Sequence, residues 1–213
     1  MPTKKPPADA TPFVPATRSL VRLASAAEDC EGCALYARAT QTVFGRGPAD
    51  AALVVVGEQP GDEEDRAGEP FVGPSGHVLD ALLKDAGIDR RLVYVTNAVK
   101  HFKWEPRGKR RMHSKPNPSE VAACHPWLAA ELALVDATVV VCLGATAAQS
   151  ILGRSFRLTA SLGQTLTSGE RRVVATYHPS AILRMPTHED REKARAQLRG
   201  DLERAWKLAR PRG

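Results

Sequence analysis

Short apolar runs alternate with longer amphipathic segments along this chain. Four runs have the length of a strand and are apolar at nearly every position, which is typical of strands buried on both faces of a parallel sheet. These predicted strands cover residues 53–57, 92–97, 138–144 and 172–177. Helical spacing and start or stop residues predict helices at 19–38 (interrupted by Cys30-Glu31-Gly32-Cys33), 75–86, 119–134, 145–152 and 189–208.

Strands that alternate with helices predict a three-layer α/β/α fold with a central, mainly parallel four-stranded sheet. A chain of 213 residues can bury a core in one domain, which we place at residues 18–210. Residues 1–17 are rich in Pro and Ala and lack periodicity, so we expect a flexible lead-in. Residues 58–76 and 100–115 are predicted to be loops, and 154–170 a loop or β excursion.

The net charge of +6 is concentrated in one segment. Residues 100–115 contain seven basic side chains and one acidic one, which leaves 23 of each in the rest of the chain. A neutral body with one cationic segment favours a polyanion as partner, nucleic acid first, although a solvated loop would look the same. No apolar run could span a membrane and no secretory signal is present, so we expect a cytoplasmic protein without membrane contact.

Four cysteines, Cys30, Cys33, Cys124 and Cys142, need an explanation other than disulfides, which a reducing compartment disfavours. They suggest a metal site, either zinc or a cubane iron–sulfur cluster, and the count of thiols does not decide between these. Cys142 alone fits equally well as a small apolar residue of a buried strand. The CxxC pair favours the metal site, which would tie the N-terminal helix to the sheet.

Several chemically versatile side chains follow the predicted strands. Ligands of open parallel sheets bind at the carboxyl ends of the strands, where Glu58, Asn97 and His178 lie. Glu58 could orient an imidazole or a water, and the Asn97 amide matches the edge of a nucleobase. Phe71 could stack on a base, and His178 could donate to an anionic oxygen. Each has a simpler interpretation as a solvated acid, an Asx turn, a core aromatic or a turn residue.

The basic segment includes Gly108-Lys109-Arg110-Arg111-Met112-His113. Neighbouring cations disfavour the imidazolium form of His113, and a neutral imidazole is a nucleophile. The segment could therefore deliver a histidine to an electrophile on bound DNA. It could also be a solvated loop, or one that only grips phosphates.

Together these motifs resemble the iron–sulfur uracil-DNA glycosylases, family 4 of that superfamily, and most closely its UdgX branch. The resemblance covers about residues 20–205. It rests on Cys30-x-x-Cys33 with Cys124 and Cys142, on Gly57-Glu58-Gln59-Pro60-Gly61-Asp62, on residues 68–76 and 95–100, and on His178-Pro179-Ser180. The basic loop ending in His113 distinguishes the UdgX branch, whose commoner form has Ile where this chain has Met112.

The resemblance implies a DNA repair enzyme with a uracil-DNA glycosylase-like fold and a [4Fe-4S] cluster. Such an enzyme flips uracil out of DNA, here preferably single-stranded, and breaks the bond between base and sugar. In UdgX-type proteins the loop histidine then captures the sugar C1′, so each protein molecule reacts about once. We also expect the protein to be a monomer. The implied roles are catalytic for His113, Glu58, His178 and Asp62; uracil-binding for Gln59, Phe71, Asn97 and Gly57; DNA-binding for Lys109, Arg110, Arg111 and Ser180; and cluster-binding for Cys30, Cys33, Cys124 and Cys142.

Two other functions remain open from the sequence. One is a multiple-turnover uracil-DNA glycosylase in which water captures the sugar. The other is a metal-stabilised nucleic-acid-binding protein without catalysis, which would rest on the basic segment and the cysteines alone.

Overall fold

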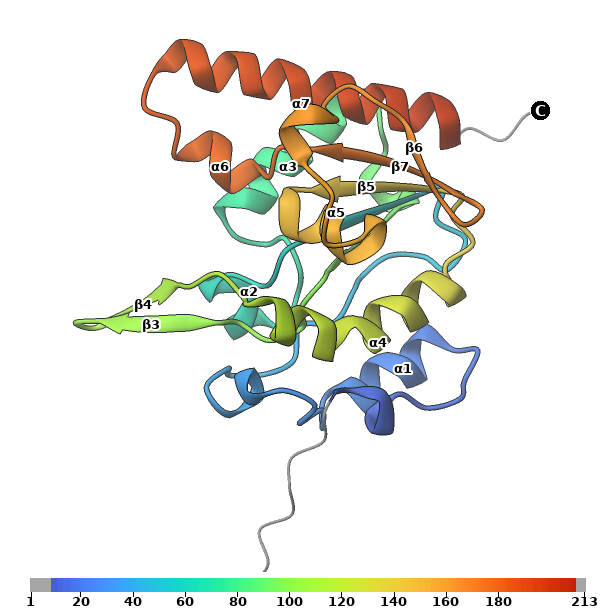
Figure 1. The fold of residues 1–213 in the computed structure, drawn as a ribbon, viewed down its shortest axis with the longest axis vertical. Helices are drawn as coiled ribbons and strands as arrows, with labels where there is room; N and C mark the ends of the chain where they lie inside the picture. Colours follow the sequence, from blue (N-terminus) through green and yellow to red (C-terminus); the bar gives the residue numbers. More distant parts are fainter. Residues whose placement is uncertain (1–8, 210–213) are drawn as a thin grey trace, which may run out of the picture.

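A computed structural model describes residues 9–209, and a five-stranded sheet lies at its centre (Figure 1). The strand order is β2-β1-β5-β7-β6, and only β6 runs antiparallel to its neighbour. The strands are β1 (Leu53–Gly57), β2 (Val93–Asn97), β5 (Val139–Leu143), β6 (Leu166–Ser168) and β7 (Arg171–Thr176). The predicted α/β/α fold is confirmed. The sheet has five strands and not four, because the predicted excursion supplies β6 at the edge.

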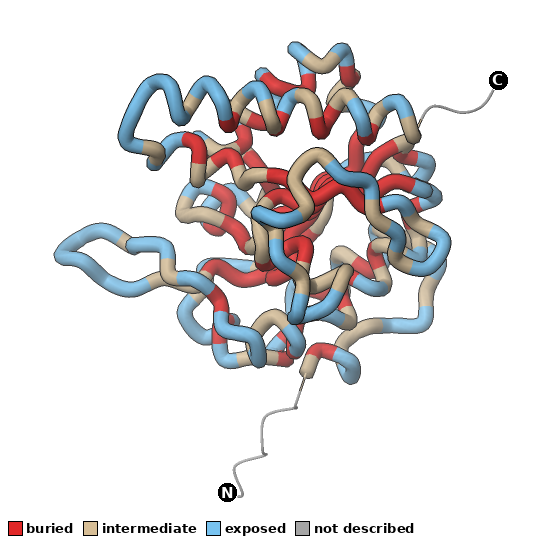
Figure 2. Tube along the Cα trace, turned by 45° about the horizontal axis from the view of Figure 1, so that its top comes forward, coloured by how far each residue is buried: buried red, intermediate tan, exposed pale blue. Residues whose placement is uncertain are grey.

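Helices cover both faces of the sheet. On one face lie α3 (Pro74–Asp85), α6 (Pro179–Leu183) and α7 (His188–Ala209). On the other face lie α4 (Pro118–Leu134) and α5 (Ala145–Leu152). Alternate strand residues enter opposite apolar clusters, as Val54 and Val55 do, so the strands need apolar side chains at every position. Figure 2 shows the resulting concentration of buried residues in the sheet.

The N-terminal segment packs against α4. It contains η1 (Thr11–Phe13), α1 (Leu20–Ala27) and η2 (Ala34–Ala37). Ala10 is buried and its N–H donates to the Ala123 carbonyl at 2.8 Å. The packed domain therefore begins earlier than the predicted boundary at residue 18. Residues 1–8 of the predicted lead-in lie outside the described residues.

Two predicted loops contain secondary structure. Residues 58–76 include α2 (Asp62–Ala67), whose start is capped by the Glu64 side chain through the Gly61 N–H at 3.0 Å. Residues 100–115 form an antiparallel hairpin, β3 (Trp104–Arg107) with β4 (Arg110–His113). Gly108 lies in the tight turn between β3 and β4 and has the positive φ, 60°, that such a turn needs. The hairpin projects from the body of the molecule (Figure 1).

None of the helices between residues 9 and 209 combines the length and the apolar composition that a membrane-spanning segment needs.

A buried ion pair between Lys100 and Glu131 supports the end of β2. Lys100 Nζ lies 2.5 Å from Glu131 Oε2, and neither side chain is more than 1% exposed. The same ammonium donates to Thr96 Oγ1 and to the carbonyl of Asn97, each at 2.7 Å. The ion pair therefore fixes the backbone that carries Asn97.

Replacing Glu131 with glutamine should lower the free energy of unfolding by about 3–5 kcal/mol, because the buried Lys100 ammonium loses its counter-charge. Urea denaturation measures the change. Glu203→Gln is the matched control, since it only weakens a solvent-exposed pair with Arg199 at 3.6 Å. That variant should lose less than about 1 kcal/mol. Equal stability of the two variants would contradict this role of Glu131.

Candidate active site

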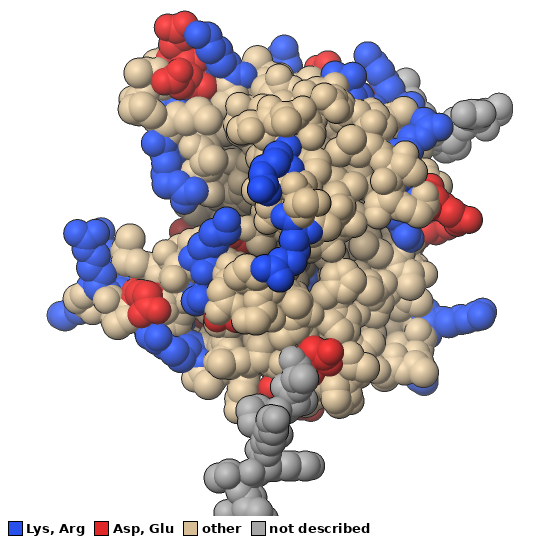
Figure 3. Space-filling model, viewed as in Figure 1, with Lys and Arg blue, Asp and Glu red and all other residues tan. Residues whose placement is uncertain are grey.

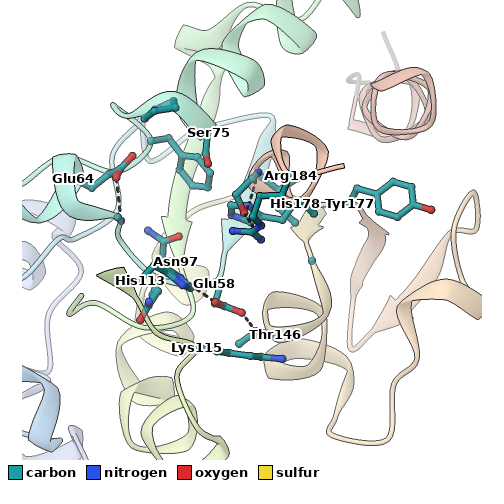
Figure 4. A pocket seen from close by; sticks show the side chains of 18 of the residues that line it. Glu58, Glu64, Ser75, Asn97, His113, Lys115, Thr146, Tyr177, His178 and Arg184 are labelled. Carbon is teal, nitrogen blue, oxygen red and sulfur yellow. Dashed lines mark hydrogen bonds and ion pairs between the residues drawn. The ribbon is translucent and has the colours of Figure 1, made fainter. Parts of the chain in front are cut away.

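A cavity of about 690 Å³ opens beside the carboxyl ends of β1, β2, β5 and β7. Its lining includes Glu58, Phe71, Asn97, His113 and His178. These come from five separate segments of the chain, and Figure 4 shows four of them around the same space. The structure thus brings together the side chains that the sequence placed at strand ends and the histidine of the basic segment.

Glu58 lies between His113 and Thr146 (Figure 4). Its Oε1 is 3.4 Å from His113 Nε2, and its Oε2 accepts the Thr146 hydroxyl at 2.5 Å. Burial by itself would raise the pKa of Glu58, but the hydrogen bonds from His113 and Thr146 outweigh it, so the pKa lies below its usual value. Glu58 is therefore a carboxylate at neutral pH, with Oε1 facing the His113 ring.

Arg111 anchors the hairpin that carries His113. Its guanidinium donates to Asp62 Oδ1 at 2.5 Å and to the buried Asp65 Oδ2 at 2.6 Å. Residues two apart in a strand share a face, so this anchor also sets the direction of His113. Only 16% of the Arg111 side chain is exposed. Arg111 thus holds the hairpin through two carboxylates, and its contact with DNA stays a prediction.

Asp62 is occupied by arginines on both oxygens. Oδ1 accepts from Arg111, and Oδ2 accepts from Arg66 Nε at 3.1 Å. Although Asp62 lines the cavity, its carboxylate is committed to holding the hairpin. These contacts are those of a supporting residue, and a catalytic role of Asp62 stays a prediction.

The Gln59 side chain clamps the base of the hairpin. Its Nε2 donates to the carbonyls of Lys103 at 3.2 Å and Ser114 at 3.0 Å, and its Oε1 accepts from the Lys103 N–H at 3.1 Å. These two partners flank β3 and β4. Both polar ends of the side chain are therefore hydrogen-bonded within the protein. The backbone of Gln59 is the part that we predict to lie close to the uracil.

Phe71 and Asn97 line the cavity, and Gly57 lies directly against both side chains, so the three form one wall. A Cβ on Gly57 would stand 2.3 Å from Asn97 Oδ1 and 2.7 Å from Phe71 Cζ, so both side chains approach the bare backbone. Phe71 has a left-handed φ of 58°, which costs free energy in a residue with a side chain. Its ring is stacked with that of His178, with 6.3 Å between centroids. The wall is flat, apolar and equipped with one amide.

His178 is held as a neutral donor. Its Nδ1 accepts the N–H of Ser180 at 3.1 Å and lies 2.9 Å from the Ser180 hydroxyl. Because Nδ1 accepts, the hydrogen of the neutral ring is on Nε2. Burial lowers the pKa of His178 to about 4, despite the opposing effect of Glu58. Ser180, predicted to bind DNA, therefore has a positioning contact with His178.

Lys109 and Arg110 lie at the hairpin turn and are exposed. Figure 3 shows basic side chains at the outer end of this hairpin. Their contact with an external polyanion stays a prediction.

The cysteines do not form a group of four. Cys30, Cys33 and Cys124 share the apolar cluster between the N-terminal segment and α4. Cys142 is fully buried in β5 and belongs to the separate cluster between the sheet and α5. The prediction that Cys142 joins the other three is therefore wrong. It is the small apolar strand residue that the sequence also allowed.

His101 was missed by the sequence reasoning and fits the place that Cys142 leaves. It follows Lys100, whose N–H donates to Cys124 Sγ at 3.2 Å. The Thr42 hydroxyl donates to the Ala27 carbonyl at 2.7 Å, so its oxygen accepts from His101 Nε2 at 2.9 Å. His101 Nδ1 then keeps its lone pair and, among residues 9–209, has no partner although it is buried. Its position directly after the 95–100 motif was the available signal.

These side chains suit a cluster better than a single ion. Within the described part of the chain, no three His, Cys, Asp or Glu side chains converge on a site for one metal ion. A four-iron cluster spans a cube of iron and sulfur, so its ligands stand further apart than those of one ion. The orphaned nitrogen of His101, one residue after the Lys100 N–H that donates to Cys124 Sγ, is a candidate fourth ligand for such a cluster.

Comparison with known proteins defines the family. Residues 44–203 match the Uracil DNA glycosylase superfamily, so the chain belongs to that superfamily. It is 37% identical over 179 residues to the Type-4 uracil-DNA glycosylase of Thermotoga maritima, covering 80% of this chain and 90% of that protein. It is also 37% identical over 165 residues to the Type-4 uracil-DNA glycosylase of Archaeoglobus fulgidus, covering 74% of this chain and 79% of that protein.

Proposed function

We propose that this protein excises uracil from DNA and then becomes covalently attached, through His113, to C1′ of the resulting abasic sugar. Superfamily membership and the Type-4 relatives support the excision. One observation carries the attachment: His113 Nε2 lies 3.4 Å from the Glu58 carboxylate at the cavity. Phosphate binding alone would not require the hairpin to place a histidine beside the Glu58 carboxylate, so this contact favours a chemical role for His113.

The wall of Phe71, Asn97 and Gly57 would receive the base. A uracil flipped out of the strand would stack on Phe71, while the Asn97 amide offers a donor and an acceptor to its edge. Gly57 lets Phe71 and Asn97 pack against its backbone because it has no side chain. The DNA, preferably single-stranded, would reach the cavity past Lys109 and Arg110, which would contact its phosphates.

His178 and Glu58 would promote departure of the base. The C1′–N1 bond breaks and its electron pair stays on uracil N1, which spreads negative charge to O2. The Nε2–H of neutral His178 would stabilise that charge, and one such donor is worth about 3 kcal/mol in a transition state. The Glu58 carboxylate would stabilise the positive charge that develops on the sugar.

His113 would then close the reaction. A lone pair of its ring forms the C1′–N bond, and the ring gives up one proton to Glu58 or solvent. The uracil anion takes up a proton, so atoms and charge balance without an oxidant. A tethered imidazole has a high effective concentration relative to water. The product has no good leaving group, so the protein would react about once.

The cluster site would stiffen this framework. Cys30, Cys33, Cys124 and His101 would hold a [4Fe-4S] cluster, which supplies crosslinking between segments and no step of the reaction. His101 and Cys124 belong to the segment after β2 and to α4, while Cys30 and Cys33 follow α1. This crosslink would secure the base of the hairpin that carries His113.

The test is to mix the protein with a labelled single-stranded oligonucleotide that contains one uracil, and to separate the products on a denaturing gel. The proposal predicts released uracil and a shifted band that survives denaturation, with no more than one uracil released per protein. Repeated release of uracil without a shifted band would instead support the water-using enzyme. Neither uracil nor a shifted band would support a non-catalytic binding protein.

A further inference from the structure

Thr146 makes a contact that the proposed reaction has not yet used. It lies in the first turn of α5 and is only 6% exposed. Its hydroxyl donates to Glu58 Oε2 at 2.5 Å, across 88 positions of sequence. The other oxygen of the same carboxylate faces His113. One carboxylate therefore joins α5 to the hairpin.

We propose that Thr146 is a positioning residue that fixes the Glu58 carboxylate with one oxygen turned toward His113 and helps to keep it ionised. This inference rests on the proposed roles of Glu58 and His113.

The anchor of this contact is rigid. Ala147 and Ala148, the next residues of α5, are fully buried against the sheet. The helix starts after Gly144, whose φ of 88° forms the turn from β5. A Cβ on Gly144 would stand 3.2 Å from His178 Cβ, so the same turn packs under the second histidine of the site. Thr146 is thus fixed relative to β5 and His178.

The orientation of Glu58 needs such an anchor. A glutamate side chain has several rotatable bonds, and ordering them costs free energy. The contact with His113 is long, at 3.4 Å, and comes from a projecting hairpin. The shorter bond from Thr146 fixes Oε2, which leaves Oε1 as the oxygen that can meet the imidazole. Without the hydroxyl, Glu58 would be free to turn away.

The charge of Glu58 depends on the same bond. The titratable groups facing it are His113 from β4 and His178 after β7, and Lys115 lines the same cavity. Burial favours the protonated acid, and hydrogen bonds from His113 and Thr146 reverse that preference. Removing the Thr146 hydroxyl removes one bond that lowers the pKa of Glu58. Glu58 would then need a higher pH to lose its proton. When the pH is lowered, activity that needs the carboxylate would therefore be lost at a higher pH than in the unsubstituted protein.

Thr146→Val and Thr146→Ser separate positioning from packing. Valine keeps the shape and removes the donor, whereas serine keeps the donor. In single-turnover reactions with uracil-containing single-stranded DNA, Thr146→Val should form the adduct about tenfold more slowly or worse. The acidic limb of its rate–pH profile should move to higher pH. Thr146→Ser should follow the unsubstituted protein. A valine variant with unchanged rate and profile, or a serine variant as impaired as valine, would overturn the inference.

A second measurement makes this test independent of the adduct. Carboxyl-carbon NMR of labelled protein without DNA reports the titration of Glu58 directly, with Glu58→Gln used to assign the signal. The pKa of Glu58 should be higher in Thr146→Val than in the unsubstituted protein or Thr146→Ser. If that shift is present and no adduct forms, the proposed function fails while the positioning by Thr146 stands. An unchanged pKa would overturn the positioning even if the adduct forms.

Discussion

Replacing His113 with alanine should abolish the covalent protein–DNA product while leaving uracil release in place. The bond-breaking groups, His178, Asn97 and Glu58, lie on the body of the protein and not on the hairpin. Without the imidazole, water would reach the cationic sugar and the abasic DNA would dissociate. The reaction should then change from about one uracil per protein to many. Denaturing gels together with quantification of free uracil measure both changes.

Met112→Ala is the matched control for His113→Ala. Met112 is the adjacent hairpin residue and its side chain is exposed, so its loss changes the same strand without removing the nucleophile. This variant should still form the adduct. An adduct that persists in His113→Ala, or one that is lost equally in both variants, would refute His113 as the nucleophile.

Replacing His101 with alanine should remove the iron–sulfur cluster, whereas replacing Cys142 with alanine should leave it. His101 Nδ1 is a buried lone pair without a partner among residues 9–209, close to the segment that contacts Cys124. Cys142 belongs to a different apolar cluster. Iron content and visible absorbance of anaerobically purified protein measure cluster occupancy without reference to activity.

His101→Cys provides the complementary test, because thiolate is the usual ligand of such clusters. That variant should keep its iron. Loss of iron from Cys142→Ala together with its retention in His101→Ala would restore the original assignment of four cysteines and contradict the role of His101.

The elements that could be predicted from the sequence are those whose burial requires a run of apolar residues. Strands such as β1 and β5 are covered on both faces, so every position is apolar and the run is visible. The hairpin of β3 and β4 has no such apolar run. Its strands are four residues each, mostly exposed, and β3 contains Pro106. Contacts from Gln59 and Arg111, which are distant in sequence, hold it to the body.

The candidate site was predictable where it follows from topology. Parallel strands end at one edge of the sheet, so Glu58, Asn97 and His178 were expected to converge there. The pairing of Thr146 with Glu58 was not predictable, because helix residues 88 positions away leave no spacing signal. Cys142 was misassigned because counting thiols does not tell which apolar cluster a strand residue enters.

The basic segment also has a more specific organisation than its charge suggested. Arg111 forms ion pairs with Asp62 and Asp65, which fix the hairpin, while Lys109 and Arg110 remain exposed at the turn. His113 faces the Glu58 carboxylate. The cations of residues 109–111 therefore divide into an anchor, Arg111, and two exposed residues at the turn, Lys109 and Arg110.

Peptide mass mapping of the protein–DNA product tests the central claim most directly. A shifted band alone could arise from Lys115, an amine that lines the cavity and could form an imine with the aldehyde of an abasic site. After nuclease and protease digestion, the account predicts that the deoxyribose remnant is attached to His113, without prior chemical reduction. A remnant on Lys115 or another residue, with His113 unmodified, would contradict it.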